Sequence, residues 1–272
     1  MRHTVFNPIG TTALVTGASS GLGVGYAHEL ARRGADLVLT ARRQELLEGL
    51  AVELAEKYGT VCTVIPLDLA RSDAVAELVA ELETRSISVG TLVNNAGFGT
   101  YGSVLDSDPA REWEQVALNV QSLTALTHAL LPGLISTAQA LPGSAALVNL
   151  ASTASFQPVP QMAVYAATKA YVLSYTEALW YETRDTGLKV TAICPGPVST
   201  EFFVVAGRTT SAFRSMLTVD DVMRTSFDAL DRASTPPHSV SGRRNALLAG
   251  IGGRLPHRLV VTAAGRLSRA TG

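Results

Sequence analysis

The chain has few cysteines and almost no excess of one charge. Only Cys62 and Cys194 occur among its 272 residues, and each lies in an apolar stretch typical of a strand. We therefore expect buried, reduced thiols with no metal-ligand spacing, which favours a cytoplasmic setting. The net charge is −1, which excludes a polycation built as a whole for nucleic acid.

Long apolar runs and repeats are absent too. No uninterrupted apolar stretch approaches the roughly 18 residues that a membrane-spanning helix needs. Residues 1–4 are not followed by the apolar run of a signal peptide. No internal repeat or low-complexity linker divides the chain, and its composition, 47% apolar and 17% charged, is globular. We expect one domain over residues 1–272.

Short apolar runs alternate with helical patterns. The predicted strands are Thr12–Thr16, Asp36–Ala41, Val61–Pro66, Thr91–Asn94, Ala145–Ala151 and Lys189–Cys194. The predicted helices are Gly21–Arg33, Arg43–Tyr58, Ser72–Arg85, a long one from Pro109 to about Thr137, and Ala163–Thr186. Because the strands are apolar on both faces, the pattern predicts an α/β fold, a doubly wound parallel sheet covered by helices on both sides. Ligands of such sheets bind beyond the carboxyl ends of the strands.

A glycine-rich turn joins the first strand to the first helix. It reads Thr16-Gly-Ala-Ser-Ser-Gly-Leu-Gly23, with the spacing Gly-x3-Gly-x-Gly. Glycines allow the backbone to approach a pyrophosphate closely, and the helix directs its N–H groups at the phosphates. The turn therefore predicts a dinucleotide site. Gly25, early in the helix, is explained only by close packing.

The second strand ends in Thr40-Ala-Arg-Arg43, with Ala41 where an acid would hold the ribose of NAD. Arg42 follows at once, and a guanidinium suits a 2′-phosphate. We expect a preference for NADP; the alternative is that Arg42 and Arg43 are solvated residues at the start of a helix.

Tyr165 and Lys169 lie four residues apart, on one face of a predicted helix. An ammonium beside a phenol lowers the phenol's pKa and makes it usable as a general acid or base. By itself the Tyr-x3-Lys spacing is common and is usually structural.

Further motifs occur in order along the chain: Asn94-Asn-Ala-Gly97, Asn119, Ser152, Tyr165-Ala-Ala-Thr-Lys169 and Pro195-Gly196. Together with the glycine turn they closely resemble the classical short-chain dehydrogenase/reductase family over about residues 10–200. The resemblance implies a Rossmann-type sheet of about seven strands, a Ser152-Tyr165-Lys169-Asn119 tetrad, and a dimer or tetramer.

The resemblance also implies roles for single residues. Tyr165 exchanges a proton with the substrate oxygen, Ser152 orients that oxygen, Lys169 lowers the Tyr165 pKa and holds the ribose, and Asn119 holds a relay water. The implied cofactor contacts are Gly17, Ser19, Ser20, Gly21, Leu22, Gly23, Arg42, Asp68, Leu69, Asn95, Ala96, Gly97, Tyr165, Lys169, Pro195, Gly196, Val198 and Thr200.

Residues 201–217 form a longer connection of mixed polarity, typical of a lid or binding loop, before a helix that Thr218 caps. The expected substrate pocket is apolar, with Phe98, Phe156, Met162, Pro197 and Phe202 as its lining and Ser155 nearby. The sequence thus predicts an NADP(H)-dependent oxidoreductase for a hydrophobic ketone or alcohol. The alternatives are a 3-oxoacyl-thioester reductase and a non-catalytic NADP-binding regulator.

The C-terminal tail, about residues 242–270, is helical and basic. From Arg232 onward the chain has seven arginines and neither lysine nor acid. We expect the tail to pack on the subunit or on a neighbouring copy; the alternative is peripheral contact with anionic lipid.

Overall fold

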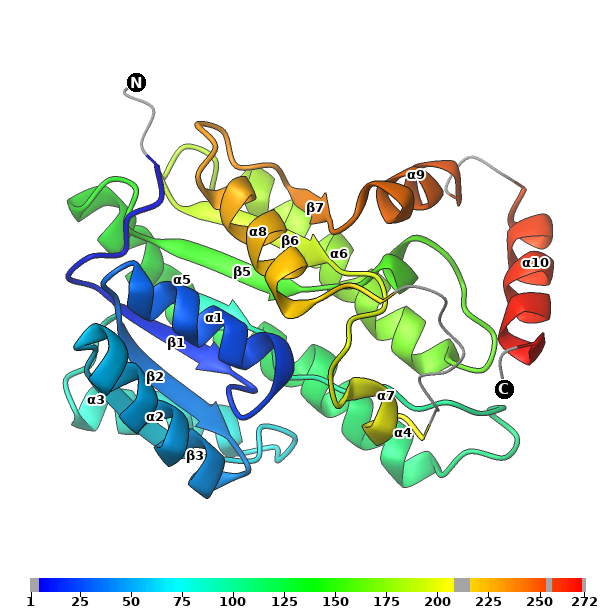
Figure 1. Ribbon diagram of the computed structural model, residues 1–272, viewed down its shortest axis with the longest axis horizontal. Helices are drawn as coiled ribbons and strands as arrows, with labels where there is room; N and C mark the ends of the chain where they lie inside the picture. The colour runs from blue at the N-terminus through cyan, green and yellow to red at the C-terminus, as the bar shows by residue number, and fades with distance from the viewer. Residues whose placement is uncertain (1–4, 208–215, 253–255, 271–272) are drawn as a thin grey trace.

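The computed structural model describes residues 5–207, 216–252 and 256–270. Its centre is a seven-stranded parallel sheet of order β3-β2-β1-β4-β5-β6-β7 (Figure 1). The strands are β1 (Thr12–Thr16), β2 (Asp36–Ala41), β3 (Cys62–Pro66), β4 (Val89–Asn94), β5 (Ala146–Leu150), β6 (Lys189–Cys194) and β7 (His238–Val240). The order reverses between β1 and β4, which confirms the predicted doubly wound α/β sheet.

Helices cover both faces of the sheet. In chain order, the helices of the described residues are α1 (Gly21–Arg32), α2 (Gln44–Tyr58), α3 (Ala74–Thr84), α4 (Pro109–Val116), α5 (Leu123–Ala140), α6 (Ala163–Glu182), α7 (Phe202–Val205), α8 (Val219–Leu230), α9 (Arg243–Gly252) and α10 (His257–Ala270). Figure 1 shows α9 and α10 at one side of the molecule, α10 farthest from the sheet.

Successive residues of a strand enter two different cores. Val15 of β1 packs in a cluster with residues of α1, α2 and α8, whereas Leu14 packs in a second cluster with residues of α3, α5 and α6. This is the alternation that a pleated strand imposes. Because apolar clusters pack on both faces of the sheet, the strands and their ends are held in fixed positions.

Two helices lie so close that only glycine fits between them. A Cβ atom added to Gly25 in α1 would lie 2.5 Å from Cγ1 of Val219 in α8. This contact accounts for a glycine early in a helix. At the start of α8, Thr218 and Asp221 form a capping box, so the predicted cap at Thr218 is confirmed.

The predicted long helix from Pro109 is interrupted. Residues Ala117–Ser122 form a π-helical segment between α4 and α5, which buries Asn119 and Ser122. A periodicity of 3.6 residues carries no sign of the one extra residue that a π-turn inserts. The sequence pattern also located no strand at β7, which is only three residues long. Among the described residues, no helix combines the length and the apolarity that crossing a membrane requires.

Candidate functional site

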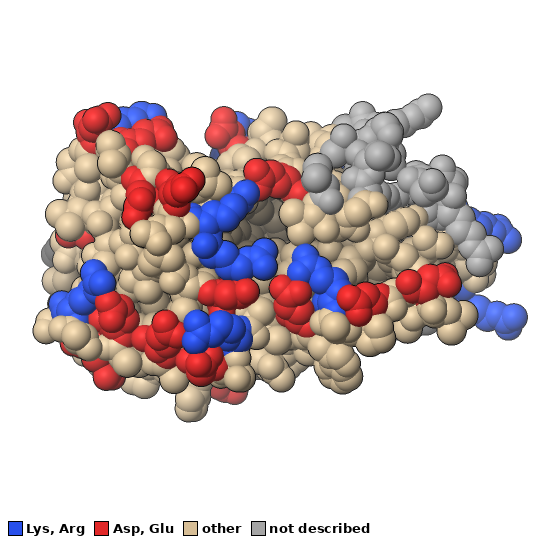
Figure 2. Space-filling model, turned by 90° about the horizontal axis from the view of Figure 1, so that it is seen from below, with Lys and Arg blue, Asp and Glu red and all other residues tan. Residues whose placement is uncertain are grey.

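A cavity of about 580 Å³ opens at the carboxyl ends of the strands, where the fold predicts a ligand site. Figure 2 shows a hollow in this face, with basic and acidic side chains around its opening. The lining includes these predicted cofactor contacts: Gly17, Ser19, Ser20, Gly21, Leu22, Arg42, Asp68, Leu69, Asn95, Ala96, Gly97, Tyr165, Lys169, Pro195, Gly196, Val198 and Thr200. Residues far apart in the sequence thus meet in one cavity.

The glycine turn is locked to the end of β4. Thr16 Oγ1 accepts hydrogen bonds from the backbone N–H groups of Asn95 and Ala96 at 3.0 and 2.9 Å. Asn95 Nδ2 donates to the Thr16 carbonyl at 2.9 Å. Gly17 has a φ of 65°, and an added Cβ there would lie 2.9 Å from the Ala96 Cα. Only glycine can therefore occupy this position.

Gly23 differs from its prediction as a cofactor contact, because it lies beneath the turn and does not line the cavity. A Cβ atom on Gly23 would come within 2.2 Å of the Gly17 carbonyl oxygen. Its role in the structure is to let α1 pack closely under the turn.

The first turn of α1 suits a phosphate. It holds no acidic residue, and the side chain of its N-cap residue Ser20 makes no capping hydrogen bond. The N–H groups of this turn therefore lack a cap from Ser20, at the positive end of the helix dipole. With the backbone of Gly17 able to approach a ligand closely, these residues fit the pyrophosphate of a dinucleotide.

Arg42 and Arg43 both line the cavity but have different partners. Arg42 lies between two carboxylates, 3.9 Å from Asp68 and 3.6 Å from Glu114. Arg43 donates to Ser19 Oγ at 3.3 Å and to Glu201 Oε2 at 2.9 Å. The sequence interpretation treated Arg43 only as a solvated residue and missed Glu201. The adjacent arginines were the only signal that pointed to this contact.

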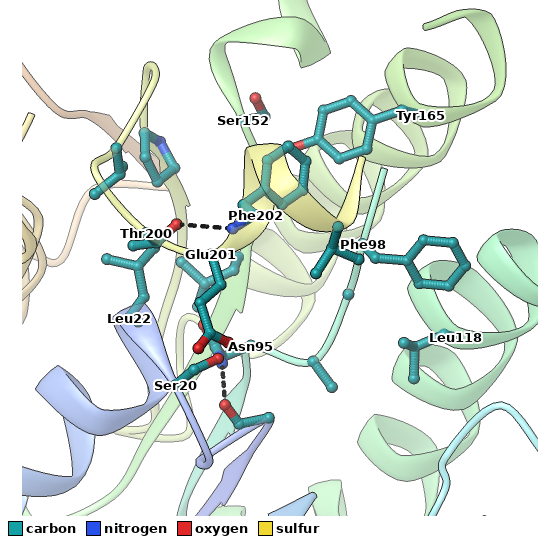
Figure 3. Close-up of a pocket in the computed structure, with 18 of the residues that line it drawn as sticks. Ser20, Leu22, Asn95, Phe98, Leu118, Ser152, Tyr165, Thr200, Glu201 and Phe202 are labelled. Carbon is teal, nitrogen blue, oxygen red and sulfur yellow. Dashed lines mark hydrogen bonds between the residues drawn. The ribbon is translucent and has the colours of Figure 1, made fainter. Parts of the chain in front are cut away.

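Ser152 and Tyr165 lie near each other at the other end of the cavity (Figure 3), which Lys169 also lines. Ser152 caps a 3₁₀ turn that follows β5, and its hydroxyl is near enough to Tyr165 to act against the rise in the pKa of the phenol. Tyr165 and Lys169 are four residues apart on α6, about one helical turn, and both side chains are buried. Lys169 Nζ donates to the Leu150 carbonyl at 2.6 Å and lies 5.9 Å from the centroid of the Tyr165 ring.

Burial dominates the pKa values of this group. Burial raises the pKa of Tyr165 to about 12, a rise that the nearby Ser152 side chain opposes, and burial lowers the pKa of Lys169 to about 8. The expected lowering of the Tyr165 pKa below its ordinary value is thus absent, because the loss of water around the phenol outweighs its neighbours. Both side chains are held toward their neutral forms.

Asn119 is buried in the π-helical segment and does not line the cavity. Its Oδ1 accepts from the Phe98 N–H at 3.1 Å, and its Nδ2 donates to the Phe98 carbonyl and to Thr168 Oγ1. A Cβ atom on Gly97 would lie 2.9 Å from Asn119 Oδ1 and 3.5 Å from Lys169 Nζ. The side of Gly97 that carries no Cβ thus faces both the Asn119 amide and the Lys169 ammonium; the relay water stays a prediction.

Four of the predicted substrate residues, Phe98, Met162, Pro197 and Phe202, line the cavity. Phe156 does not; its ring packs edge-on against His238, with centroids 5.5 Å apart. Ser155, expected in the lining, instead donates to the Lys169 carbonyl at 2.7 Å and accepts from the Ser152 N–H. The 3₁₀ turn Thr153–Phe156 directs both side chains away from the cavity.

The substrate end is partly covered by α7 and touched by the tail. The Phe202 ring lies against Tyr165 with centroids 5.3 Å apart. Of the predicted loop 201–217, residues 208–215 lie outside the described residues. In α9, Asn245 packs on the cavity residue Gly196, where a Cβ atom would lie 2.3 Å from Asn245 Nδ2. The tail thus packs on its own subunit, and its contact with lipid stays a prediction.

Comparison with known proteins agrees with this geometry. The family model described as short chain dehydrogenase matches residues 11–210. Sulfoacetaldehyde reductase 2 of Chromohalobacter salexigens is 38% identical over 193 residues, which are 71% of this chain and 74% of that protein. A short-chain dehydrogenase from Sphingobium yanoikuyae in complex with NADPH has a TM-score of 0.78 at 31% identity, covering 90% of this chain and 94% of that one.

A second solved structure is the bulky-bulky ketone specific alcohol dehydrogenase from Comamonas testosteroni. It has a TM-score of 0.74 at 29% identity and covers 90% of this chain and 93% of that one. The family model, the relative and the two structures agree with the motifs and the strand order. The chain therefore belongs to the short-chain dehydrogenase family of oxidoreductases.

Proposed function

We propose that the protein is an NADP(H)-dependent oxidoreductase that interconverts a hydrophobic carbonyl compound and its alcohol. The observation that carries the proposal is one continuous cavity, which has the glycine turn at one end and Ser152, Tyr165 and Lys169 at the other. A dinucleotide on the turn would extend toward Tyr165. The nicotinamide, when bound, supplies or accepts the hydride.

In this proposal Tyr165 gives its phenolic proton to the carbonyl oxygen, or takes it back in the oxidation. Ser152, which lines the cavity with Tyr165, orients the same oxygen. With its pKa near 8, Lys169 can pass protons to and from Tyr165 close to neutral pH. The surrounding apolar side chains, Phe98, Met162 and Phe202, exclude water from the transfer.

Two arginines favour NADP over NAD. Arg42 and Arg43 line the cavity at the end of β2, where a 2′-phosphate would lie, and Ala41 supplies no carboxylate for a ribose hydroxyl. The NADPH complex of the Sphingobium enzyme, with its similar fold, supports the same choice.

The apolar lining and the Comamonas enzyme for bulky ketones favour a hydrophobic ketone. A 3-oxoacyl thioester remains the second candidate, since the open cavity can admit a long chain. A non-catalytic regulator is less consistent with Ser152, Tyr165 and Lys169 meeting in one cavity. The cytoplasmic setting and the homodimer or homotetramer belong to the same proposal.

The test is a spectrophotometric screen of NADPH oxidation across bulky ketones, steroids, acyl thioesters and sulfoacetaldehyde, repeated with NADH. We expect the highest kcat/KM with a bulky ketone and with NADPH. Faster turnover of an acyl thioester would select the second candidate. Tighter binding of NADH than of NADPH would overturn the cofactor assignment.

A further inference from the structure

Glu201 lies where its carboxylate meets the groups that fit a phosphate. Arg43 Nη2 donates to Glu201 Oε2 at 2.9 Å. The carboxylate also lies beside the hydroxyl of Ser20, the N-cap residue of α1 (Figure 3), and Arg43 and this hydroxyl hold the pKa of Glu201 below its usual range. All three residues line the cavity. A side-chain anion thus lies at the positive end of α1, next to an arginine that faces the glycine turn.

Glu201 is also joined to the substrate end. It directly precedes Phe202, the first residue of α7, whose ring lies 5.3 Å from that of Tyr165. The backbone before Glu201 is fixed, because Ser199 N–H donates to the Leu217 carbonyl and Leu217 N–H donates to the Pro197 carbonyl. Glu201 thus stands between a backbone segment held by hydrogen bonds and the ring that lies against Tyr165.

We infer that Glu201 is an internal competitor for the cofactor's phosphates, and that its displacement from Arg43 and Ser20 moves Phe202 away from Tyr165. The inference rests on the proposed function, since it takes the ligand of the glycine turn to be a phosphate-bearing dinucleotide. Two anions cannot share the Arg43 guanidinium and the Ser20 hydroxyl without repulsion, so a phosphate that arrives there displaces the carboxylate.

The contact is weak enough for a ligand to displace. The Arg43 and Glu201 side chains are 45% and 57% exposed, so water and salt screen their attraction. The competition makes Glu201 a determinant of cofactor affinity. It also makes the access of the substrate to Tyr165 depend on the bound cofactor, because Phe202 covers Tyr165 only while Glu201 is paired with Arg43.

The first test measures the binding of NADPH and of adenosine 2′,5′-bisphosphate to Glu201→Gln by titration calorimetry. Glutamine keeps the size of the side chain but removes the charge, so we expect both dissociation constants to fall about two- to fivefold. The matched control is Glu56→Gln, an equal loss of charge at an exposed residue of α2 outside the cavity. Glu56→Gln should leave both constants unchanged.

A double-mutant cycle with Arg43→Gln separates competition from a general change in charge. Without Arg43 the carboxylate has lost its main partner, so Glu201→Gln should change the bisphosphate constant less than about 1.5-fold in that background. The same gain with and without Arg43 would overturn the inference.

The coupling to the substrate end is tested with a tryptophan at position 202. In Phe202→Trp, adenosine 2′,5′-bisphosphate should shift the tryptophan emission, measured as the difference from the wild-type protein. In the double variant with Glu201→Gln, the emission without ligand should already resemble the ligand-bound spectrum. A tryptophan emission that changes neither with the ligand nor with the Glu201→Gln substitution would refute the coupling.

The outcomes for the two proposals are distinct. If wild-type protein binds NADPH and the Glu201→Gln constants equal those of wild type, the competition is wrong and the proposed function stands. If the wild-type protein binds neither NADPH nor the bisphosphate, the proposed function fails first.

Discussion

The two ends of the cavity are built in different ways. The cofactor end is fixed by close backbone contacts: the side chains of Thr16 and Asn95 each hydrogen-bond to the main chain of the other and join β1 to β4, and Gly17 and Gly23 leave no space for a side chain. The substrate end is formed by side chains from separate segments, among them Phe202 of α7. The first arrangement tolerates little substitution, whereas the second can change with each side chain.

Tyr165 lies at the substrate end, and its loss should have the largest effect. Tyr165→Phe removes the transferable proton, so kcat should fall about a thousandfold or more while NADPH binding changes less than twofold. Tyr171→Phe is the matched control: the same chemical change on α6, at a residue outside the cavity whose hydroxyl contacts Thr124. Full turnover of the Tyr165→Phe variant would refute the assignment.

The burial of Lys169 near Tyr165 costs free energy of folding. Burial lowers its pKa from 10.5 to about 8, so the unfolded chain binds the extra proton between these values and the stability from this group rises with pH in that window. Below pH 8 a charged lysine is buried, at a cost on the order of 3 kcal/mol. Lys169→Met should therefore be more stable than wild type at pH 7.

This advantage of Lys169→Met should shrink between about pH 8 and 10.5, measured by urea denaturation across that range. The exposed Lys57, changed to Met, should give a difference that does not depend on pH. An advantage of Lys169→Met that grows with pH would contradict the role of burial.

Because closely packed backbone forms the cofactor end, we expect one added methyl group to disrupt it. In Gly23→Ala the new Cβ would meet the Gly17 carbonyl oxygen at 2.2 Å, so we expect a loss of about 1–3 kcal/mol in stability and at least a tenfold weaker affinity for NADPH. Gly49→Ala, where nothing lies within 4 Å, should gain roughly 0.5–1 kcal/mol from helix propensity. Equal melting temperatures for both variants would show that the turn can relax.

At the substrate end a comparable change should have the smallest effect. Asn245→Ala removes the side chain that packs on Gly196 and donates to the Ser241 carbonyl at 2.9 Å. We expect KM for the ketone to change about two- to fivefold, with kcat nearly constant. Leu247→Ala on the same helix, at a residue 64% exposed, should leave KM unchanged. A thousandfold loss of kcat in Asn245→Ala would instead show that the tail takes part in catalysis.

What the sequence could predict depends on whether a position is set by local pattern or by contacts between distant segments. The strands and the positions of Gly17, Ser152, Tyr165 and Lys169 were accessible because they depend on local periodicity and on motif spacing. The predicted lining residue Phe156 was wrong because a single 3₁₀ turn decides whether its ring faces the cavity or His238.

Contacts between distant segments could not be predicted in this way. The Arg43–Glu201 ion pair joins residues 158 positions apart, and neither residue alone carries a distinctive pattern. The π-helical segment around Asn119 was not predicted, because the apolar pattern of so short a segment does not distinguish i→i+5 hydrogen bonds from those of an α-helix.

In the proposed reaction a hydride passes between the bound nicotinamide and a carbonyl carbon beside Tyr165. NADPH deuterated at the transferable position of C4 and a ketone found by the screen test this transfer, with the product alcohol analysed by mass spectrometry. We expect one deuterium on the carbinol carbon with the wild-type protein and none above background with Tyr165→Phe. Binding of NADPH with no deuterium in any alcohol would contradict it and favour a regulator.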